Sequence, residues 1–74
     1  MVMEHIIPNG STFRYEGYKY HVVKCIEDDL TKELIYVVRY YGKHKQWWHY
    51  EAWTQKVFVI RIENGLCKQM NLKH

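Results

Sequence analysis

The side chains best suited to binding chemistry in this sequence gather between Tyr36 and Trp53. The aromatic members of the stretch are Tyr36, Tyr40, Tyr41, Trp47, Trp48, Tyr50 and Trp53. Its basic and titratable members are Arg39, Lys43, His44, Lys45 and His49, and Glu51 is its single acid. Aromatic rings interleaved with cations suit a packed core, a stacking platform for nucleic-acid bases, or a groove for a peptide. The stretch therefore indicates a small binding module and leaves these three uses open.

Part of this stretch must fill the core. A chain of 74 residues forms one domain, spanning residues 1–74, and a domain of this size buries only about 60 to 65% of its unfolded surface. Large side chains are needed to fill so small a core, so we expect Tyr36, Trp47 and Trp53 to be mainly buried. Trp47 and Trp48 are adjacent, and adjacent residues of a strand point to opposite faces. At least one of these two indoles is therefore expected at the surface.

An exposed indole beside cations forms a stacking and cation–π surface. The residues expected in this surface are Arg39, Tyr40, Lys43, His44, Lys45, Trp48, His49 and Tyr50. If the partner is nucleic acid, bases stack on the rings while the cations approach phosphates, and binding weakens steeply with salt. If the partner is a protein, the same rings anchor a desolvated patch and the charges form its rim. Both partners remain open.

Metal binding and catalysis have weaker support. His44 and His49 are the tempting metal-binding pair, but no Cys-x-x-Cys or His-x-x-x-His spacing accompanies them. Cys25 lies four residues after His21, yet a cysteine within a run of valine and isoleucine is typical of a small buried hydrophobe. We therefore expect a non-enzymatic protein with no metal site and no cofactor.

The elements that must position these residues are mainly strands. Alternating apolar and polar residues, rich in β-branched and aromatic types, predict strands over Thr12–Glu16, Tyr18–Ile26, Leu34–Tyr41, Trp47–Tyr50, Lys56–Glu63 and Leu66–Lys68. A weak edge strand over Met1–Ile7 and a single helical turn over Glu51–Gln55 are also expected. Asn64-Gly65 predicts a two-residue type I′ hairpin turn, and residues 69–74 are expected to fray. The pattern is that of an all-β domain, a small antiparallel barrel or a strongly bent sheet.

Residues 10–57 resemble a family of small bacterial domains catalogued as domain-of-unknown-function family 1653. The residues that carry the resemblance are Phe13-Arg14-Tyr15-Glu16-Gly17, Tyr20, Val22, Thr31, Glu33, Ile35, Tyr41-Gly42, Trp47, Glu51, Trp53 and Val57. The resemblance implies an SH3-like antiparallel β-barrel of five to six short strands with at most one helical turn. The family usually follows its tryptophan with Val-Arg-Pro, whereas Trp48-His49-Tyr50 follows Trp47 here. The resemblance therefore implies a fold and no particular function.

Charge and cysteine content limit the setting in which the protein works. The net charge is +3 with an isoelectric point near 8.9, which permits phosphate binding without implying it. Four acids cluster between Glu27 and Glu33, away from the basic stretch. With only two cysteines, no secretory signal, and Leu34–Val38 as the longest apolar run, we expect free thiols, a cytoplasmic location and no membrane contact. A monomer or weak homodimer is expected.

Overall fold

The computed structural model describes residues 7–44 and 46–73, which form five strands and one helix. In chain order these elements are β1 (Thr12–Tyr15), β2 (Tyr18–Glu27), β3 (Leu34–Tyr41), β4 (Trp48–Thr54), α1 (Gln55–Glu63) and β5 (Lys68–Asn71). The strands form one antiparallel sheet in the order β4-β3-β2-β1-β5. The prediction of a small, mostly β domain is therefore confirmed.

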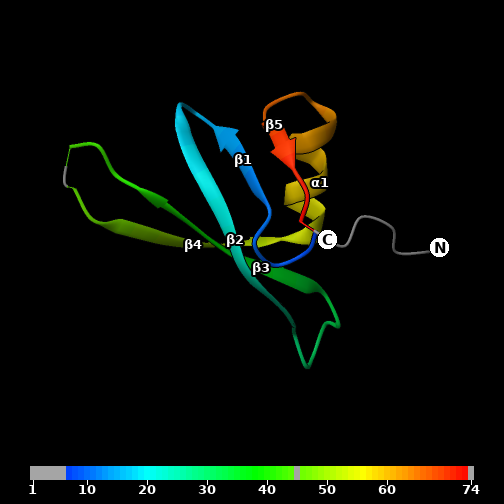
Figure 1. Ribbon diagram of the computed structural model, residues 1–74. Coiled ribbons are helices and arrows are strands. Elements are labelled where there is room, and N and C mark those ends of the chain that lie inside the picture. Colours follow the sequence, from blue (N-terminus) through cyan, green and yellow to red (C-terminus); the bar gives the residue numbers. More distant parts are fainter. Residues whose placement is uncertain (1–6, 45, 74) are drawn as a thin grey trace.

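The sheet is open, with β4 and β5 at its two edges (Figure 1). Barrel closure, which the expected SH3-like barrel requires, is thus not confirmed among the described strands. Helix α1 packs on one face of the sheet, where its Phe58 ring meets rings of β1, β3 and β4. The β3–β4 hairpin extends away from the helix (Figure 1). We call the face that α1 covers the inner face, and the opposite face the outer face.

The inner face carries the core, and α1 contributes Phe58 to it. The fully or nearly buried side chains are Ile7, Phe13, Tyr20, Val22, Tyr36, Val38, Trp53, Phe58 and Cys67. The ring centroid of Phe58 lies 5.1 Å from that of Phe13, 5.3 Å from that of Tyr36 and 5.2 Å from that of Trp53. Tilted and edge-on ring pairs at such spacings add to the area burial that holds the helix on the sheet. Burial of Tyr36 and Trp53 is confirmed.

The predicted strand over Lys56–Glu63 is wrong, because these residues form α1. Thr54 caps the helix N-terminus by accepting a hydrogen bond from the Val57 amide at its side-chain oxygen. At the other end Asn64 has φ −88° and only Gly65 has positive φ, at 73°, whereas a type I′ turn needs positive φ at both residues. Asn64-Gly65 therefore ends a helix and makes no hairpin.

Two further boundaries differ from expectation. Glu51–Gln55 was expected to make a helical turn, but β4 runs to Thr54 and pairs with β3 at every residue from Trp48 onward. The C-terminal segment was expected to fray, but Lys68–Asn71 forms β5 against β1. The Ser11 hydroxyl also accepts a hydrogen bond from the Lys73 amide at 3.0 Å. Of the expected edge strand over Met1–Ile7, only Ile7 lies within the described residues, and it is not in a strand.

A bulge in β2 decides which side chains of its second half face inward. Val22 pairs with Val38, but Lys24 pairs with Val37, so Val23 is an extra residue on β2. Because side chains alternate along a strand, the extra residue moves Cys25 to the inner side, where it packs against the core, and Ile26 to the outer side. Cys25 and Cys67 are not bridged.

No helix within the described residues has the length and apolar character needed to cross a bilayer.

Candidate nucleic-acid interface

The outer face presents two rows of side chains that run across the strands. One row crosses all five strands. On β5, β1 and β2 it consists of Lys68, Arg14 and Lys19, since Arg14 is paired with both lysines. On β3 and β4 it consists of the paired residues Tyr41 and Trp48. We call Lys68, Arg14, Lys19, Tyr41 and Trp48 the first row. Paired side chains on one face of neighbouring strands lie about 5 Å apart. The first row therefore changes from three cations on β5, β1 and β2 to two aromatic rings on β3 and β4.

The second row lies parallel to the first, two residues further along each of the central strands. Its members are Asn71, Thr12, His21, Arg39 and Tyr50, and each is paired with the next in the sheet. The Arg39 guanidinium carbon lies 4.4 Å from the ring centroid of Trp48 and 5.9 Å from that of Tyr50. Arg39 Nη1 also donates a hydrogen bond to the Tyr50 hydroxyl at 3.0 Å. These contacts hold a cation against the aromatic end of both rows.

Trp48 is the centre of the aromatic end. Besides the cation of Arg39, its ring meets His21 edge-on at 5.7 Å and Tyr41 edge-on at 5.4 Å between centroids. The side chain is still 41% exposed. The expectation that Trp48 lies at the surface is therefore confirmed, and its neighbours fix the orientation of the ring so that it can act as a preorganised stacking surface.

A hollow of about 310 Å³ lies over the first row. It is lined by Arg14, Gly17, Tyr18, Lys19, His21, Tyr41, Lys43 and Trp48. Arg14 is held by a hydrogen bond from its Nη2 to the Gly17 carbonyl at 2.9 Å, and the Lys43 ammonium lies 5.8 Å from the Tyr18 ring centroid. No acid lines the hollow. Such a hollow suits an anionic ligand that also has an aromatic ring.

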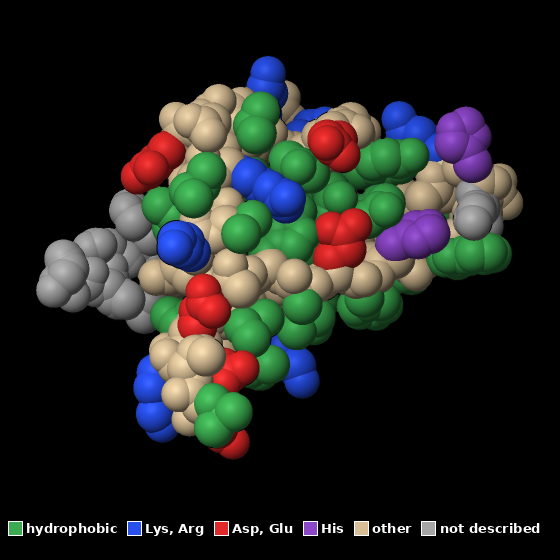
Figure 2. All heavy atoms as spheres, turned by 180° about the vertical axis from the view of Figure 1, so that it is seen from behind, with side chains coloured by type: hydrophobic (Ala, Val, Ile, Leu, Met, Phe, Trp, Pro, Cys, Tyr) green, Lys and Arg blue, Asp and Glu red, His purple; other side chains and the backbone are tan. Residues whose placement is uncertain are grey.

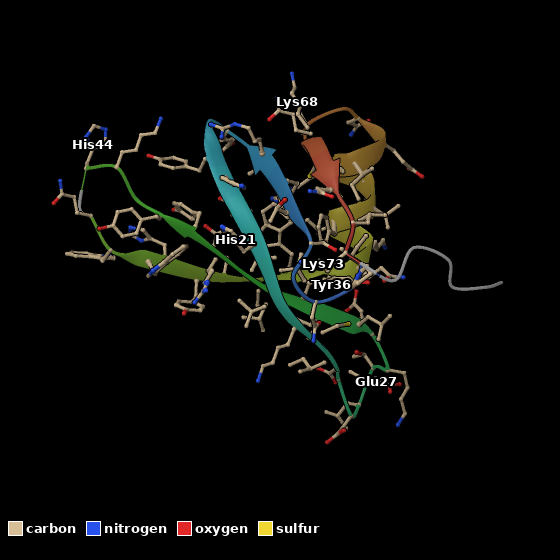
Figure 3. All side chains as sticks on the ribbon, in the orientation of Figure 1. His21, Glu27, Tyr36, His44, Lys68 and Lys73 are labelled. Carbon is tan, nitrogen blue, oxygen red and sulfur yellow. The ribbon has the colours of Figure 1, made fainter. Side chains whose placement is uncertain are left out.

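The rest of the outer face is also without acids. The register places five cations of the strands on it, namely Arg14, Lys19, Lys24, Arg39 and Lys68, and no Asp or Glu among the described residues. The described acids lie in the β1–β2 turn, at the last residue of β2 (Glu27), in the β2–β3 loop, on the inner side of β4 and in α1. Figure 3 shows the labelled Glu27 near the β2–β3 loop, far from Lys68 and from the β3–β4 hairpin. A positive potential therefore covers the outer face.

The pKa of His21 is affected by its burial and by the cations around it. Its pKa is lowered from the ordinary value by burial, and further by the positive charges of Lys19 and Arg39. His21 is therefore held in the neutral form near pH 7, when it can stack or accept a hydrogen bond. An anion placed beside it would favour the protonated form.

The structure divides the predicted site residues between the two faces. Arg39, Trp48 and Tyr50 come together on the outer face, and Lys43 reaches the hollow over the first row. Tyr40 and His49 face the inner side, where their rings stack at 5.0 Å between centroids. His44 lies with them around a smaller hollow of about 190 Å³. Lys45 lies outside the described residues.

Trp47 contradicts the expectation of burial, since it is 55% exposed. It precedes β4, where the β3–β4 hairpin has already extended beyond the core, and its ring packs on His49 at 5.8 Å. Figure 2, seen from behind, shows histidine side chains at the hairpin end of the molecule, beyond a surface on which hydrophobic side chains surround acidic and basic ones. Both adjacent indoles are therefore at the surface, on opposite faces.

Reasoning from the sequence did not assign these contributors of the outer face to the binding surface: Arg14, Lys19, His21, Lys24, Tyr41 and Lys68. For Arg14, Lys19 and His21 the sequence held a signal in Gly17, which permits a tight turn. In the structure Glu16 and Gly17 both have positive φ, at 51° and 85°, as in a type I′ turn. Such a turn fixes the pairs Arg14↔Lys19 and Thr12↔His21. Nothing local signals that Lys68 is paired with Arg14, because that contact depends on the return of the chain after α1.

Among residues 7–44 and 46–73, no three His, Cys, Asp or Glu side chains lie close enough together to hold a metal ion.

Comparison with known proteins gives no relative: no family model matches the chain, and no curated protein or solved structure matches it significantly.

Proposed function

We propose that the outer face binds single-stranded nucleic acid and that the protein is a non-enzymatic binding module. The observation that carries this proposal is the ordering of the first row. Lys68, Arg14 and Lys19 form a line of cations that leads to Tyr41 and Trp48, with no acid on the described part of that face. A line of cations follows a phosphate backbone, and exposed rings stack on bases.

The dimensions of the face suit a short strand. Five neighbouring strands spaced by about 4.8 Å make the first row about 19 Å long, which accommodates several nucleotides at about 3.4 Å per stacked nucleotide. Phosphates would follow the cations of β5, β1 and β2, and a base would lie on the exposed surface of Trp48. Lys43 and His21 line the hollow beside Trp48 and would be further partners for phosphates or base edges.

A single strand fits this surface better than a duplex. In a duplex the base faces are covered by their neighbours, so only the edges and the backbone are accessible to a protein. The ring of Trp48 offers a flat surface, which pairs with the face of an unstacked base. Stacking of this kind is sequence-tolerant, and the predicted selectivity among bases is accordingly weak.

The proposal is tested by titrating the intrinsic tryptophan fluorescence with labelled and unlabelled oligonucleotides at several salt concentrations. The logarithm of the binding constant is expected to fall linearly with the logarithm of salt, by about 0.7 for each phosphate contact. Lys19→Glu should weaken binding at low salt about tenfold or more and reduce this slope. The matched control is Lys56→Glu, which makes the same charge change on the exposed side of α1.

Equal affinities of Lys19→Glu and Lys56→Glu would show that only the net charge matters and would remove the proposed face. Absence of any binding to single strands at low salt would remove the function.

A protein partner is the second candidate, and one observation favours it. The outer face continues past the second row into apolar side chains, of which Ile26 and Val23 are exposed. An apolar area next to aromatic anchors is the arrangement found at the centre of protein interfaces. Binding to such a partner would survive high salt, whereas binding to a phosphate backbone would not. For either partner we propose a cytoplasmic setting, which the two unbridged cysteines support.

A further inference from the structure

The two edges of the sheet differ in how well they are protected from pairing with another strand. The β5 edge is four residues long, its register shifts against β1, and Gln69 within it has φ of 52°. Short and irregular edges discourage pairing. The β4 edge is seven residues long, pairs with β3 without a shift, and contains no Pro, Lys or Arg. A long, regular edge without such residues is a template for another strand.

We propose that two copies of this chain pair antiparallel along their β4 edges, with Tyr50 of each copy at the two-fold axis. Such a dimer is isologous, since the same surface of each copy meets itself. Its main-chain hydrogen bonds would extend the sheet from one copy into the other. The inference goes beyond the proposed nucleic-acid binding and is independent of it.

Side-chain complementarity selects this register among the possible ones. With Tyr50 opposite Tyr50, His49 of each copy lies opposite Glu51 of the other copy. The two-fold axis therefore creates two pairs in which an imidazole faces a carboxylate. Trp48 falls opposite Ala52, which places a large side chain beside a small one. If the two-fold axis lay at the next residue of β4, Glu51 of one copy would lie opposite Glu51 of the other. Like charges directly opposite each other destabilise a strand pair.

The same register gives the exposed Trp47 a binding place. Trp47 is on the inner side and would fall opposite Trp53 of the second copy. Beside Trp53 lies an open hollow of about 540 Å³ lined by Glu51, Ala52, Trp53, Thr54, Val57 and Arg61. Its walls are partly apolar, and the Arg61 guanidinium carbon already lies 4.4 Å from the Trp53 ring centroid. A second indole there would bury apolar area and lie within reach of a cation.

Pairing in this register would join the two outer faces into one surface. The aromatic ends of the rows, with Trp48 and Tyr50, would meet at the centre, and the cations near Lys68 would lie at the two far ends. In Figure 1 the β4 edge lies on the opposite side of the sheet from β5. A dimer of this form therefore doubles the length of the outer face without covering it.

The register is tested by disulfide cross-linking in the absence of nucleic acid. Tyr50→Cys should form a covalent dimer under mild oxidation, because residues at the axis have Cα atoms about 4.5 to 5.5 Å apart, within the range a disulfide spans. Ala52→Cys is the matched control, since it lies on the same strand and the same face but opposite Trp48. The unmodified chain controls for Cys25 and Cys67. Cross-linking of Ala52→Cys with none of Tyr50→Cys would overturn the register.

The association itself is tested by sedimentation equilibrium, again without nucleic acid. The unmodified chain should reach the mass of a dimer as its concentration rises, and Trp47→Ala should raise the dissociation constant about tenfold or more. Leu30→Ala is the control, since Leu30 is 92% exposed in the β2–β3 loop. A monomer at concentrations up to about 1 mM would overturn the inference. Because neither measurement involves nucleic acid, such a result would leave the proposed function standing.

Discussion

Three indoles within seven residues occupy three different environments. Trp53 is 4% exposed and packs against Phe13, Tyr20 and Phe58 in the core. Its ring nitrogen donates a hydrogen bond to Glu51 at 2.8 Å, which satisfies the one polar atom of the indole. The other two, Trp47 and Trp48, are exposed on the inner and outer sides of the hairpin. Residue type alone therefore does not assign a role to any of the three.

Replacing Trp53 should affect folding, and replacing Trp48 should affect binding. Trp53→Ala is expected to lower the free energy of unfolding by about 3 to 5 kcal/mol, because it leaves a cavity where four rings meet. Trp48→Ala is expected to cost about 1 kcal/mol or less of stability, mainly through the lost contact with Arg39. The same change should cost about 1 to 3 kcal/mol of binding to a single strand, since a stacked base loses its platform.

Urea unfolding and the oligonucleotide titration measure these two effects separately. A domain of this length is stable by only about 4 to 11 kcal/mol, so Trp53→Phe serves as a milder variant if Trp53→Ala does not fold. Trp48→Phe keeps a ring and should retain most of the binding. A large stability loss for Trp48→Ala, with none for either variant of Trp53, would reverse the assignment of the faces.

His21 should make stability and binding respond to pH in opposite directions. Its pKa is lowered in the folded protein, so the unfolded chain binds more protons as pH falls through about 6.5, and stability should decrease there. Bound phosphate favours the protonated imidazole, so affinity for a single strand should increase over the same range. His21→Asn should reduce both trends when unfolding and binding are measured between about pH 5 and pH 8. An unchanged pH profile of binding in this variant would separate His21 from the interface.

At the scale of elements, α1 forms although its residue types are typical of a strand, because its capping residues and its contacts with the core favour a helix. Residues 56–63 are rich in β-branched and aromatic types, as a strand is, yet Thr54 and Gly65 mark the two ends of a helix. The Gly65 amide donates to the Ile62 carbonyl, and the Leu66 amide donates to the Arg61 carbonyl at 2.9 Å, which together form a Schellman motif. Phe58 then fixes the helix on the core.

The N-cap of α1 gives a prediction at this scale. The Thr54 hydroxyl accepts a hydrogen bond from the Val57 amide at 3.3 Å, so Thr54→Ala should lower the free energy of unfolding by about 1 kcal/mol. Thr54→Ser keeps the accepting oxygen and should lose much less. Chemical denaturation of the two variants measures the difference. Equal losses in both would mean that the methyl group of Thr54, and not the cap, carries its contribution.

The strands show how strongly side-chain placement depends on register. The turn at Glu16-Gly17 sets which residues of β1 and β2 are paired, and thus brings Arg14 beside Lys19. One extra residue at Val23 then reverses the faces of the rest of β2. The outer face is therefore assembled from one tight turn, one bulge and the pairing of β5 with β1.

For the molecule as a whole, the separation of charge is the feature most relevant to a partner. The net charge of +3 is modest, but the described acids avoid the outer face of the strands while five cations lie on it. A partner that approaches this face meets a positive potential much stronger than the net charge suggests. Placement of charge, which depends on strand pairing, thus matters more than its total.

The sequence by itself determined the mostly β class, the spans of β1, β2 and β3, and the burial of Tyr36 and Trp53. These follow from local alternation and from the need of a small domain for large buried side chains. It also located the aromatic part of the outer face, with Arg39, Trp48 and Tyr50.

Only the tertiary structure decided that residues 55–63 form a helix, that Tyr40 and His49 lie on the inner face, and that the chain after the helix pairs with β1 as β5. The reason is physical: which face a strand residue occupies depends on its pairing partners and on bulges, and both depend on contacts between distant segments. The cations of Arg14, Lys19 and Lys68 come from three strands and meet only when those strands are paired.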